Sequence, residues 1–256
     1  MFDVHCHLEY MDNPKEVIKK AKEKGMSGFA TAVSDLKDKD KIMKIAKENK
    51  GFVYPCFGLH PERLQKYDMD KINDYISYIK KQKNNIAAIG EIGLDYNWIK
   101  DKNKREYSKK IFKKFIKLSK KLNKPMVLHI RDAFSDALDI LKDEKLTNNA
   151  DNVIIHFFSG NKKDLKECLK RGYWVSFNTI ICKSKYFYKL VKKTPMERML
   201  LETDAPWIDP DNDSSELTNR PWKIDRSAKK IAELKDKTKK EILNITDKNA
   251  HRALRI

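Results

Sequence analysis

Two histidines near the amino terminus are the first candidates for chemistry. His5 and His7 flank Cys6 directly after the apolar segment 1–4. If this segment is a strand, alternate side chains share a face, so both imidazoles point the same way and can reach one metal ion. Asp3 is expected on that face too, where its carboxylate could orient a ligand. An isolated His-x-His pair is more often two ordinary polar residues, so the hypothesis needs partners elsewhere in the chain.

Other candidate ligands follow apolar segments in the same way. Five of the six histidines lie at or just past the end of such a segment, whereas His251 falls in the last predicted helix, where we expect a surface residue. A mixed set of imidazoles and carboxylates suits zinc, manganese or magnesium. The residues placed in this way are His5, His7, His60, Glu91, His129, His156 and Asp204.

The elements that would position these residues alternate along the whole chain. The apolar segments are short and continuous, as is typical of buried parallel strands. Eight β-then-α units predict the α/β class and a (β/α)8 TIM barrel, with one domain over residues 1–256. Active sites of such barrels lie at the carboxyl ends of the strands, so the candidate ligands should converge. The predicted strands are 1–4, 28–33, 52–58, 86–92, 126–130, 153–157, 173–177 and 199–203, and the predicted helices are 13–24, 39–49, 70–83, 104–122, 132–146, 162–171, 185–193, 223–234 and 239–255.

Composition restricts the partners and the compartment. The chain has 55 Lys and Arg against 37 Asp and Glu, a net charge of +18, which favours an acidic partner such as nucleic acid. The lysines are spread over almost every predicted helix, so a biased genome or a hot habitat would explain them equally well. Four cysteines without a C-x-x-C motif fit a reducing cytoplasm, and no apolar run suggests a signal peptide or a membrane partner. The oligomeric state stays open, and a monomer is compatible with the sequence.

Six motifs give these observations a common interpretation. In chain order, they are DVHCHL, CFGLHP, AIGEIGLDY, VLHIRDA, HFFSG and LLETDAPW. Together they resemble the TatD family of metal-dependent deoxyribonucleases, which are amidohydrolase-like TIM-barrel hydrolases, and the resemblance covers the whole chain. It implies two divalent metal ions, one held by His5, His7, Glu91 and Asp204 and the other by Glu91, His129 and His156, with Glu91 bridging.

The resemblance also implies a reaction and roles for particular residues. The substrate would be DNA, cleaved by a metal-activated water, as in a 3′–5′ exonuclease acting on single-stranded or frayed ends. Asp204 would orient the water or take its proton, while Glu91 bridges the metals. His60 and Arg131 match positions near the scissile phosphate. Arg131 would hold phosphate oxygens and His60 would assist the leaving oxygen, unless Arg131 forms a rim salt bridge with Asp132 and His60 is only a polar loop residue.

Residues around this predicted site suggest supporting roles. Glu202 shares a strand face with Asp204 and could orient a ligand. Tyr96, Trp98 and Trp207 lie near the predicted mouth and could stack on exposed bases, although core or rim packing is the commoner role of such side chains.

Two rival functions remain open at the level of sequence. The same barrel could hydrolyse another substrate, such as an amide, an ester or an aminoacyl-tRNA. A metal-stabilised nucleic-acid-binding protein without turnover is the second alternative. The long irregular segment 205–221 is expected to be functional, although its Asn219-Arg220-Pro221 departs slightly from the Arg-Asn-x-Pro pattern of the family.

Overall fold

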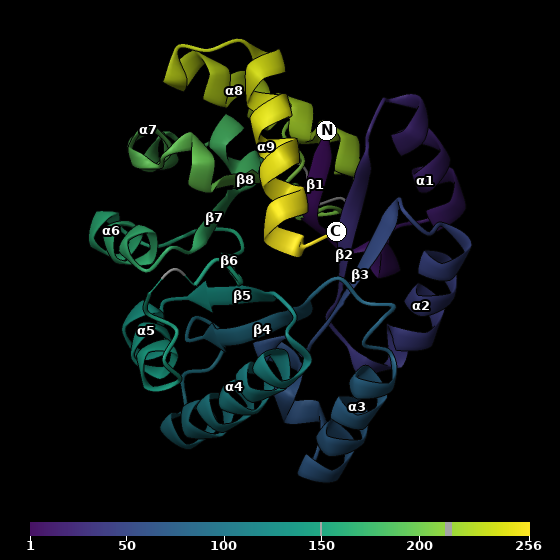
Figure 1. The fold of residues 1–256 in the computed structure, drawn as a ribbon, viewed down its shortest axis with the longest axis vertical. Coiled ribbons are helices and arrows are strands. Elements are labelled where there is room, and N and C mark those ends of the chain that lie inside the picture. Colours follow the sequence, from purple (N-terminus) through teal and green to yellow (C-terminus); the bar gives the residue numbers. More distant parts are fainter. Residues whose placement is uncertain (149, 213–216) are drawn as a thin grey trace.

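The structure is a computed structural model that describes residues 1–148, 150–212 and 217–256. Parallel strands form a barrel with helices around it, so the predicted α/β barrel is confirmed (Figure 1). The predicted loop 205–221 includes residues 213–216, which lie outside the described residues. The strands are β1 (Phe2–Cys6), β2 (Gly28–Val33), β3 (Val53–Phe57), β4 (Ile89–Asp95), β5 (Met126–Arg131), β6 (Val153–Ile155), β7 (Trp174–Phe177) and β8 (Met199–Leu201).

Helices follow the strands, and side chains at their first turns explain where several of them begin. Asn13, Asp68, Asp101, Asn161 and Thr238 each accept a hydrogen bond from a backbone N–H of the first turn, which satisfies a donor that the helix itself cannot. The helices are α1 (Pro14–Glu23), α2 (Lys39–Glu48), α3 (Met69–Lys81), α4 (Lys102–Leu122), α5 (Phe134–Asp143), α6 (Lys162–Lys170), α7 (Tyr188–Lys193), α8 (Ile224–Lys235) and α9 (Lys239–Leu254).

The barrel consists of two ladders joined by two seams. Regular parallel pairing links β1-β2-β3 and β4-β5-β6-β7-β8. Between β3 and β4, one bridge joins Cys56 to Ala88, supported by the Phe57 N–H, which donates to the Ala88 carbonyl at 3.1 Å. Between β8 and β1, the Asp204 N–H donates to the carbonyl of His5 at 3.0 Å. Both seams are therefore closed by few main-chain bonds, and candidate ligands lie beside them.

Asp3 differs from expectation. Its carboxylate accepts hydrogen bonds from the backbone N–H of His5 at 3.1 Å and from the backbone N–H of Thr203 at 3.0 Å, and its second oxygen accepts from the Thr203 hydroxyl. The pairing of β1 with β2 also shifts register between Asp3 and Cys6, so simple alternation does not extend from Asp3 to His5. Asp3 joins β1 to the segment after β8 and orients no imidazole.

Two apolar clusters fill the molecule. The inner one collects a residue from or beside each strand together with Ala250, Ala253 and Leu254 of α9. Figure 1 shows α9 lying across the barrel near the start of β1. Consistent with that position, His251 lies 5.4 Å from the ring of Phe2, and its side chain is only 38% exposed, so it is a half-buried residue at the amino end of the barrel. The outer cluster packs the helices against the strands. The amino end is thus closed, which leaves the carboxyl end for a site.

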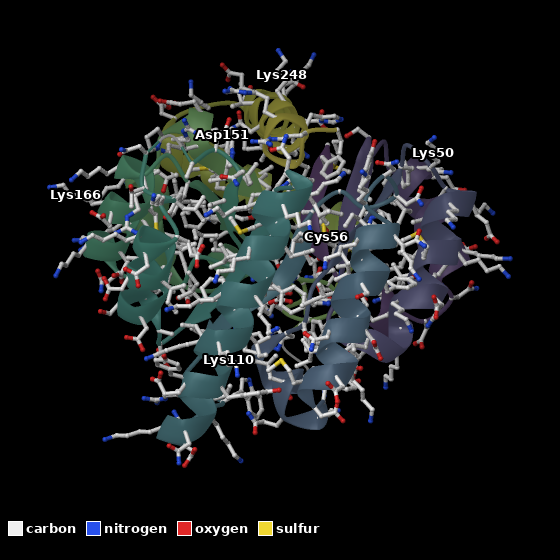
Figure 2. All side chains as sticks on the ribbon, turned by 60° about the horizontal axis from the view of Figure 1, so that its bottom comes forward. Lys50, Cys56, Lys110, Asp151, Lys166 and Lys248 are labelled. Carbon is white, nitrogen blue, oxygen red and sulfur yellow. The ribbon has the colours of Figure 1, made fainter. Side chains whose placement is uncertain are left out.

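The surface is rich in lysine on all the helices. Lys50, Lys166 and Lys248 project from separate parts of it (Figure 2). Among the described helices, none has the length and apolarity needed to cross a membrane.

Candidate metal centre

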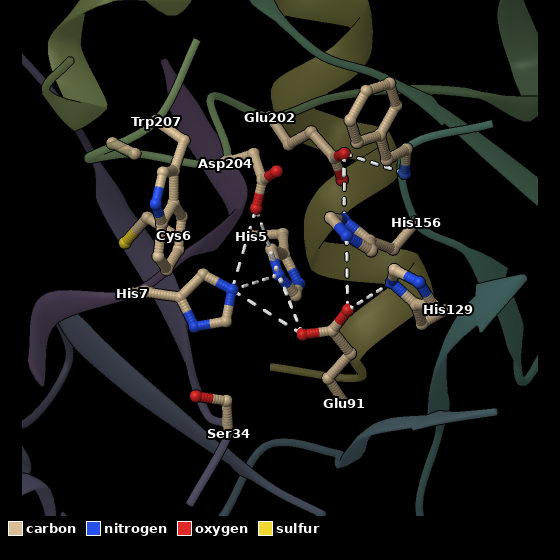
Figure 3. A network of polar contacts seen from close by, with 12 residues as sticks. His5, Cys6, His7, Ser34, Glu91, His129, His156, Glu202, Asp204 and Trp207 are labelled. Atoms are coloured by element: carbon tan, nitrogen blue, oxygen red, sulfur yellow. Dashed lines mark hydrogen bonds and ion pairs between the residues drawn. The ribbon is translucent and has the colours of Figure 1, made fainter. Parts of the chain in front are cut away.

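Glu91 lies at the centre of the candidate site, inside β4 and almost fully buried. One carboxylate oxygen, Oε2, lies 3.6 Å from His5 Nε2 and 3.5 Å from His7 Nε2. The other, Oε1, lies 2.8 Å from His129 Nδ1 and 3.4 Å from His156 Nε2. Figure 3 shows the four imidazoles around this carboxylate. One side chain therefore faces two pairs of histidines.

The first group of donors has the spacing of metal ligands. The Nε2 atoms of His5 and His7 are 3.0 Å apart, and Asp204 Oδ1 lies 3.7 and 3.6 Å from them, respectively. Ligands about 2.1 Å from a tetrahedral ion lie about 3.4 Å from one another. Glu91 Oε2, next to this group, is buried and has no hydrogen-bond donor. A divalent cation fits because it would satisfy this oxygen together with the converging lone pairs.

Three of the histidines contact a second carboxylate, His7 and His129 through a hydrogen bond and His156 at ion-pair distance. His7 Nδ1 lies 3.3 Å from Glu9, His129 Nε2 lies 2.9 Å from Asp95, and His156 Nδ1 lies 2.9 Å from Glu202. An N–H directed at a carboxylate leaves the lone pair of the other ring nitrogen facing the centre, as metal-binding histidines require. The expectation that Glu202 supports the site is consistent with this contact.

Two of these carboxylates are not predicted from the sequence. Glu9 and Asp95 are buried. Glu9 directly follows the motif DVHCHL, two residues after His7, and Asp95 stands within AIGEIGLDY, four residues after Glu91. An acidic residue at that spacing is a weak signal. Glu9 lies in the short 3-10 turn Leu8–Tyr10 and accepts hydrogen bonds from Ser34 at 3.2 Å. Asp95 ends β4.

The electrostatics of the metal-free centre follow from burial and from these contacts. Burial alone would raise the pKa of Glu91, but His60, His156 and His5 outweigh it and hold that pKa well below its usual value. Burial would lower the pKa of His129, yet hydrogen bonds to Asp95 and Glu91 raise it to about 9. At neutral pH the metal-free His129 ring is therefore protonated on both nitrogens, and a cation that binds Nδ1 must displace the proton there.

His60 reaches the same centre with its protonated ring nitrogen. Its Nδ1 accepts a hydrogen bond from the backbone N–H of Glu62 at 3.2 Å, and burial lowers the pKa of His60 to about 3. The ring is therefore neutral and carries its proton on Nε2, which lies 3.5 Å from Glu91 Oε1. His60, Glu91 and His129 form a cluster with metal-ligand spacing. The backbone contact nevertheless makes His60 a hydrogen-bond donor to the site and a poor ligand.

Two glycines allow the strands to approach each other at the centre. A Cβ at Gly58 would lie 2.5 Å from the backbone oxygen of Glu91. Gly93 has φ +147°, and a Cβ there would lie 2.0 Å from the backbone oxygen of His129. Glycine has neither the clash nor the conformational restriction. The spacing between Glu91 and His129 therefore depends on residues with no side chain.

The centre opens into a pocket of about 580 Å³ at the carboxyl end of the barrel. Arg131 lines it and pairs with no carboxylate among the described residues, so the alternative salt bridge with Asp132 is not observed. Trp98 is 59% exposed at the rim, and Trp207 packs 5.0 Å from the ring of His7. Of the two roles considered for Tyr96, packing is the one observed, because its ring is buried outside the pocket and its hydroxyl donates to Asp136.

Asn219 fixes the segment after β8. Its side-chain amide is buried and donates to the carbonyl oxygens of Thr203 at 3.0 Å, Trp207 at 2.7 Å and Ile208 at 3.0 Å. These bonds hold the turn that carries Asp204. Asp204 itself has φ +56°, a conformation that Asp tolerates better than most residues.

A closed α/β barrel with histidines and carboxylates converging at the carboxyl ends of its strands defines a metal-dependent hydrolase of the TIM-barrel class. The family model described as TatD related DNase matches residues 2–255, and the chain belongs to that family. The chain is therefore a metal-dependent hydrolase of the TatD DNase family.

Individual relatives are similar to this chain over nearly its full length. "Uncharacterized metal-dependent hydrolase YabD" of Bacillus subtilis is 34% identical over 100% of this chain and 99% of its own. "Deoxyribonuclease TATDN3" of Homo sapiens is 30% identical over 98% of this chain and 93% of its own. The crystal structure of YJJV, a TatD homologue from Escherichia coli, superimposes with a TM-score of 0.89 at 22% identity, covering 100% of this chain and 98% of that chain, and so supports the fold.

Proposed function

We propose that the protein hydrolyses phosphodiester bonds of DNA with two divalent ions, as a 3′–5′ exonuclease on single-stranded or frayed ends. The observation that carries the proposal is Glu91, whose two oxygens face different pairs of histidines. A bridging carboxylate suits two ions about 4 Å apart, the arrangement of many phosphodiesterases. The deoxyribonuclease named among the relatives supports DNA as the substrate.

The ligands follow from the contacts described above. His5, His7, Glu91 and Asp204 would hold one ion, and Glu91, His129 and His156 the other. When bound, zinc, magnesium or manganese would supply Lewis-acid activation of water and of the phosphate.

The remaining roles belong to side chains of the pocket. Arg131 lines the pocket without a carboxylate partner among the described residues, so its guanidinium is available to hold phosphate oxygens bidentately. His60 directs its Nε2–H into the centre and would donate a hydrogen bond to a phosphate or leaving oxygen. Asp204 Oδ1 faces His5 and His7, and the carboxylate is 14% exposed, which allows it to orient a water or accept its proton.

Metal content tests the ligand assignment. Elemental analysis of the purified protein should show up to about two divalent ions per chain. The double variant His129→Ala/His156→Ala leaves only Glu91 at the second position and should lose one ion. The single variant His251→Ala, at the other end of the barrel, is the control. Unchanged metal content in the double variant would refute the two-ion assignment.

Substrate specificity tests the reaction. The protein, loaded in turn with zinc, magnesium or manganese, should release nucleotides stepwise from the 3′ end of single-stranded DNA and act more slowly on blunt duplex. RNA, an amide, a carboxylic ester and an aminoacyl-tRNA serve as competing substrates. Faster turnover of one of these, or binding of DNA without cleavage in every metal, would contradict the proposal.

A further inference from the structure

A second hollow lies directly beside the metal pocket, between the start of α6 and the start of α7. We call this hollow the Tyr186 groove. It has a volume of about 620 Å³ and is lined by Asn161, Lys162, Lys185, Tyr186, Lys189 and Leu190. None of these residues belongs to the metal centre. Figure 1 shows α6 and α7 as neighbours on one side of the barrel.

The Tyr186 groove adjoins the metal pocket. Phe187 lines the metal pocket, and its ring centroid is 5.2 Å from that of Tyr186. On the opposite segment, Ser159 lines the metal pocket and Asn161 lines the groove, with only Gly160 between them. The Tyr186 hydroxyl donates to the Gly160 carbonyl at 3.3 Å, so the two segments touch where the hollows meet. A strand that leaves the metal pocket over this contact would reach the groove.

Tyr186 presents its ring to solvent in a fixed orientation. It is 56% exposed, one of the few large hydrophobic side chains of the described residues that are so exposed. The hydrogen bond to Gly160 holds one end of the ring, and Phe187 packs at 88° against it. An exposed aromatic ring that is already ordered loses little entropy when a flat group stacks on it.

The charge of the groove is positive and locally uncompensated. Lys162, Lys185 and Lys189 are exposed, and none of them forms an ion pair with a described residue. The nearest acid in sequence, Asp164, accepts a hydrogen bond from the Asn161 N–H and is engaged in the cap of α6. Most surface lysines of the described residues also lack an ion-pair partner, Lys109 with Glu106 and Asp136 being an exception, so the feature particular to the groove is that three lysines line one hollow.

We propose that the Tyr186 groove binds the single strand of nucleic acid that continues from the nucleotide in the metal pocket. A base would stack on Tyr186, and the backbone phosphates would lie near Lys162, Lys185 and Lys189. Stacking on an aromatic ring combined with a basic groove is how proteins bind single strands without sequence preference. The inference rests on the proposed function, because it extends the DNA substrate of that site beyond the reacting nucleotide.

Binding of a labelled single-stranded oligonucleotide by metal-free protein tests the groove apart from catalysis. Tyr186→Ala should weaken binding about 5- to 150-fold, as for loss of one stacked base. Tyr186→Phe keeps the ring and should bind like the parent. Lys162→Ala/Lys185→Ala/Lys189→Ala should reduce the slope of log affinity against log salt by about 2, at about 0.7 per phosphate contact.

Matched controls separate the groove from the overall charge. Lys50→Ala/Lys83→Ala/Lys248→Ala removes the same charge from exposed sites at the amino end of the barrel and should leave the salt slope unchanged. Metal-loaded Tyr186→Ala should hydrolyse bis(p-nitrophenyl) phosphate at the parent rate, since this ester needs only the metal pocket.

The outcomes distinguish the two levels of the proposal. If the parent binds and cleaves single strands but Tyr186→Ala does both equally well, the groove is not part of the strand path and the inference is wrong, whereas the proposed function stands. If the parent neither binds nor cleaves single strands, the proposed function fails and the inference fails with it. Equal salt slopes in the two triple variants would also overturn the inference.

Discussion

The tautomer of His129 depends on Asp95, and the substitution Asp95→Asn should move the ring proton to the other nitrogen. The two oxygens of Asp95 have separate partners. Oδ1 accepts from the backbone N–H groups of Asn97 at 2.8 Å and Trp98 at 3.0 Å, whereas Oδ2 lies 2.9 Å from His129 Nε2. In the variant, the carbonyl oxygen must stay on the backbone donors, so the amide NH₂ faces His129 Nε2.

This exchange turns an acceptor into a donor. Nε2 would then have to accept, and the imidazole proton would move to Nδ1, the atom that lies 2.8 Å from Glu91 Oε1 and faces the centre. When the His129 imidazolium of the parent gives up one proton to a cation, the remaining proton stays on Nε2 beside Asp95 and Nδ1 is free to bind. In the variant the remaining proton stays on Nδ1, which then cannot bind a cation. Loss of a partner that orients a metal-binding histidine typically costs 10- to 100-fold in affinity, about 1.4–2.7 kcal/mol. We expect a loss of about this size at one ion position only.

Glu202→Gln provides the matched control. There a single oxygen, Oε1, accepts from the Phe157 N–H at 2.7 Å and contacts His156 Nδ1 at 2.9 Å, while Oε2 has no partner. The carbonyl of Gln can keep both contacts, so the tautomer of His156 is retained. This variant loses the charge and places an amide where Oε2 was, but it should weaken the metal less than Asp95→Asn.

The assay is a metal titration against a chromophoric chelator at pH 8, with ¹⁵N NMR of the histidines to report the tautomer. Circular dichroism and a thermal midpoint of the metal-free variants check the fold. If Asp95→Asn binds both ions as tightly as Glu202→Gln, with His129 still protonated on Nε2, then the tautomer argument is incorrect.

Three further outcomes are expected. Asp204→Asn keeps an oxygen toward the metal but cannot take a proton, so it should retain most metal and DNA affinity while single-turnover cleavage falls about 10²–10⁴-fold; near-normal cleavage would make Asp204 structural. Gly93→Ala should lower the free energy of unfolding in urea by at least about 2 kcal/mol, because backbone strain and a 2.0 Å contact with the His129 oxygen combine. The control Gly25→Ala, at φ +76° with nothing within 4 Å, has the strain alone and should cost about 1–2 kcal/mol. Equal losses in the two variants would contradict the clash. Burial raises the pKa of Cys56 to about 12, so its thiolate fraction is very small below that pH and grows as pH rises; mass spectrometry should find Cys56 unmodified by iodoacetamide at pH 8 in the folded protein and modified in urea.

The barrel and the cluster of candidate ligands could be predicted from the sequence, because both depend on local patterns. Continuous apolar segments mark buried strands, and polar residues at their ends converge when the strands are parallel. The first and last residues of β4 were harder to predict. The segment 86–92 is apolar, yet the strand runs from Ile89 to Asp95. Apolar character continues through Ile92 and Leu94, so composition marks no edge, and pairing with β5 decides where the strand lies.

The carboxylate partners of the histidines could not be predicted from local patterns. Which ring nitrogen faces the centre depends on contacts between segments that are distant in sequence, such as Asp95 with His129 and Glu202 with His156. The same holds for Asp3, which alternation placed beside His5 but which binds Thr203 across the barrel. Periodicity predicts the face on which a residue lies, whereas the hydrogen-bond partner is a property of the closed barrel.

The location of the centre is connected to the way in which the barrel closes. His5 and Asp204 lie across the seam between β8 and β1, and Glu91 lies beside the seam between β3 and β4. Few main-chain bonds cross these seams, so side chains supply much of the closure, including Asp3 to Thr203. Cations bound to His5, Glu91 and Asp204 would join β1, β4 and the segment after β8, and would do so only in the folded chain. Ligand binding to the native state alone stabilises it, so the residues proposed for catalysis would also hold together the least paired parts of the barrel.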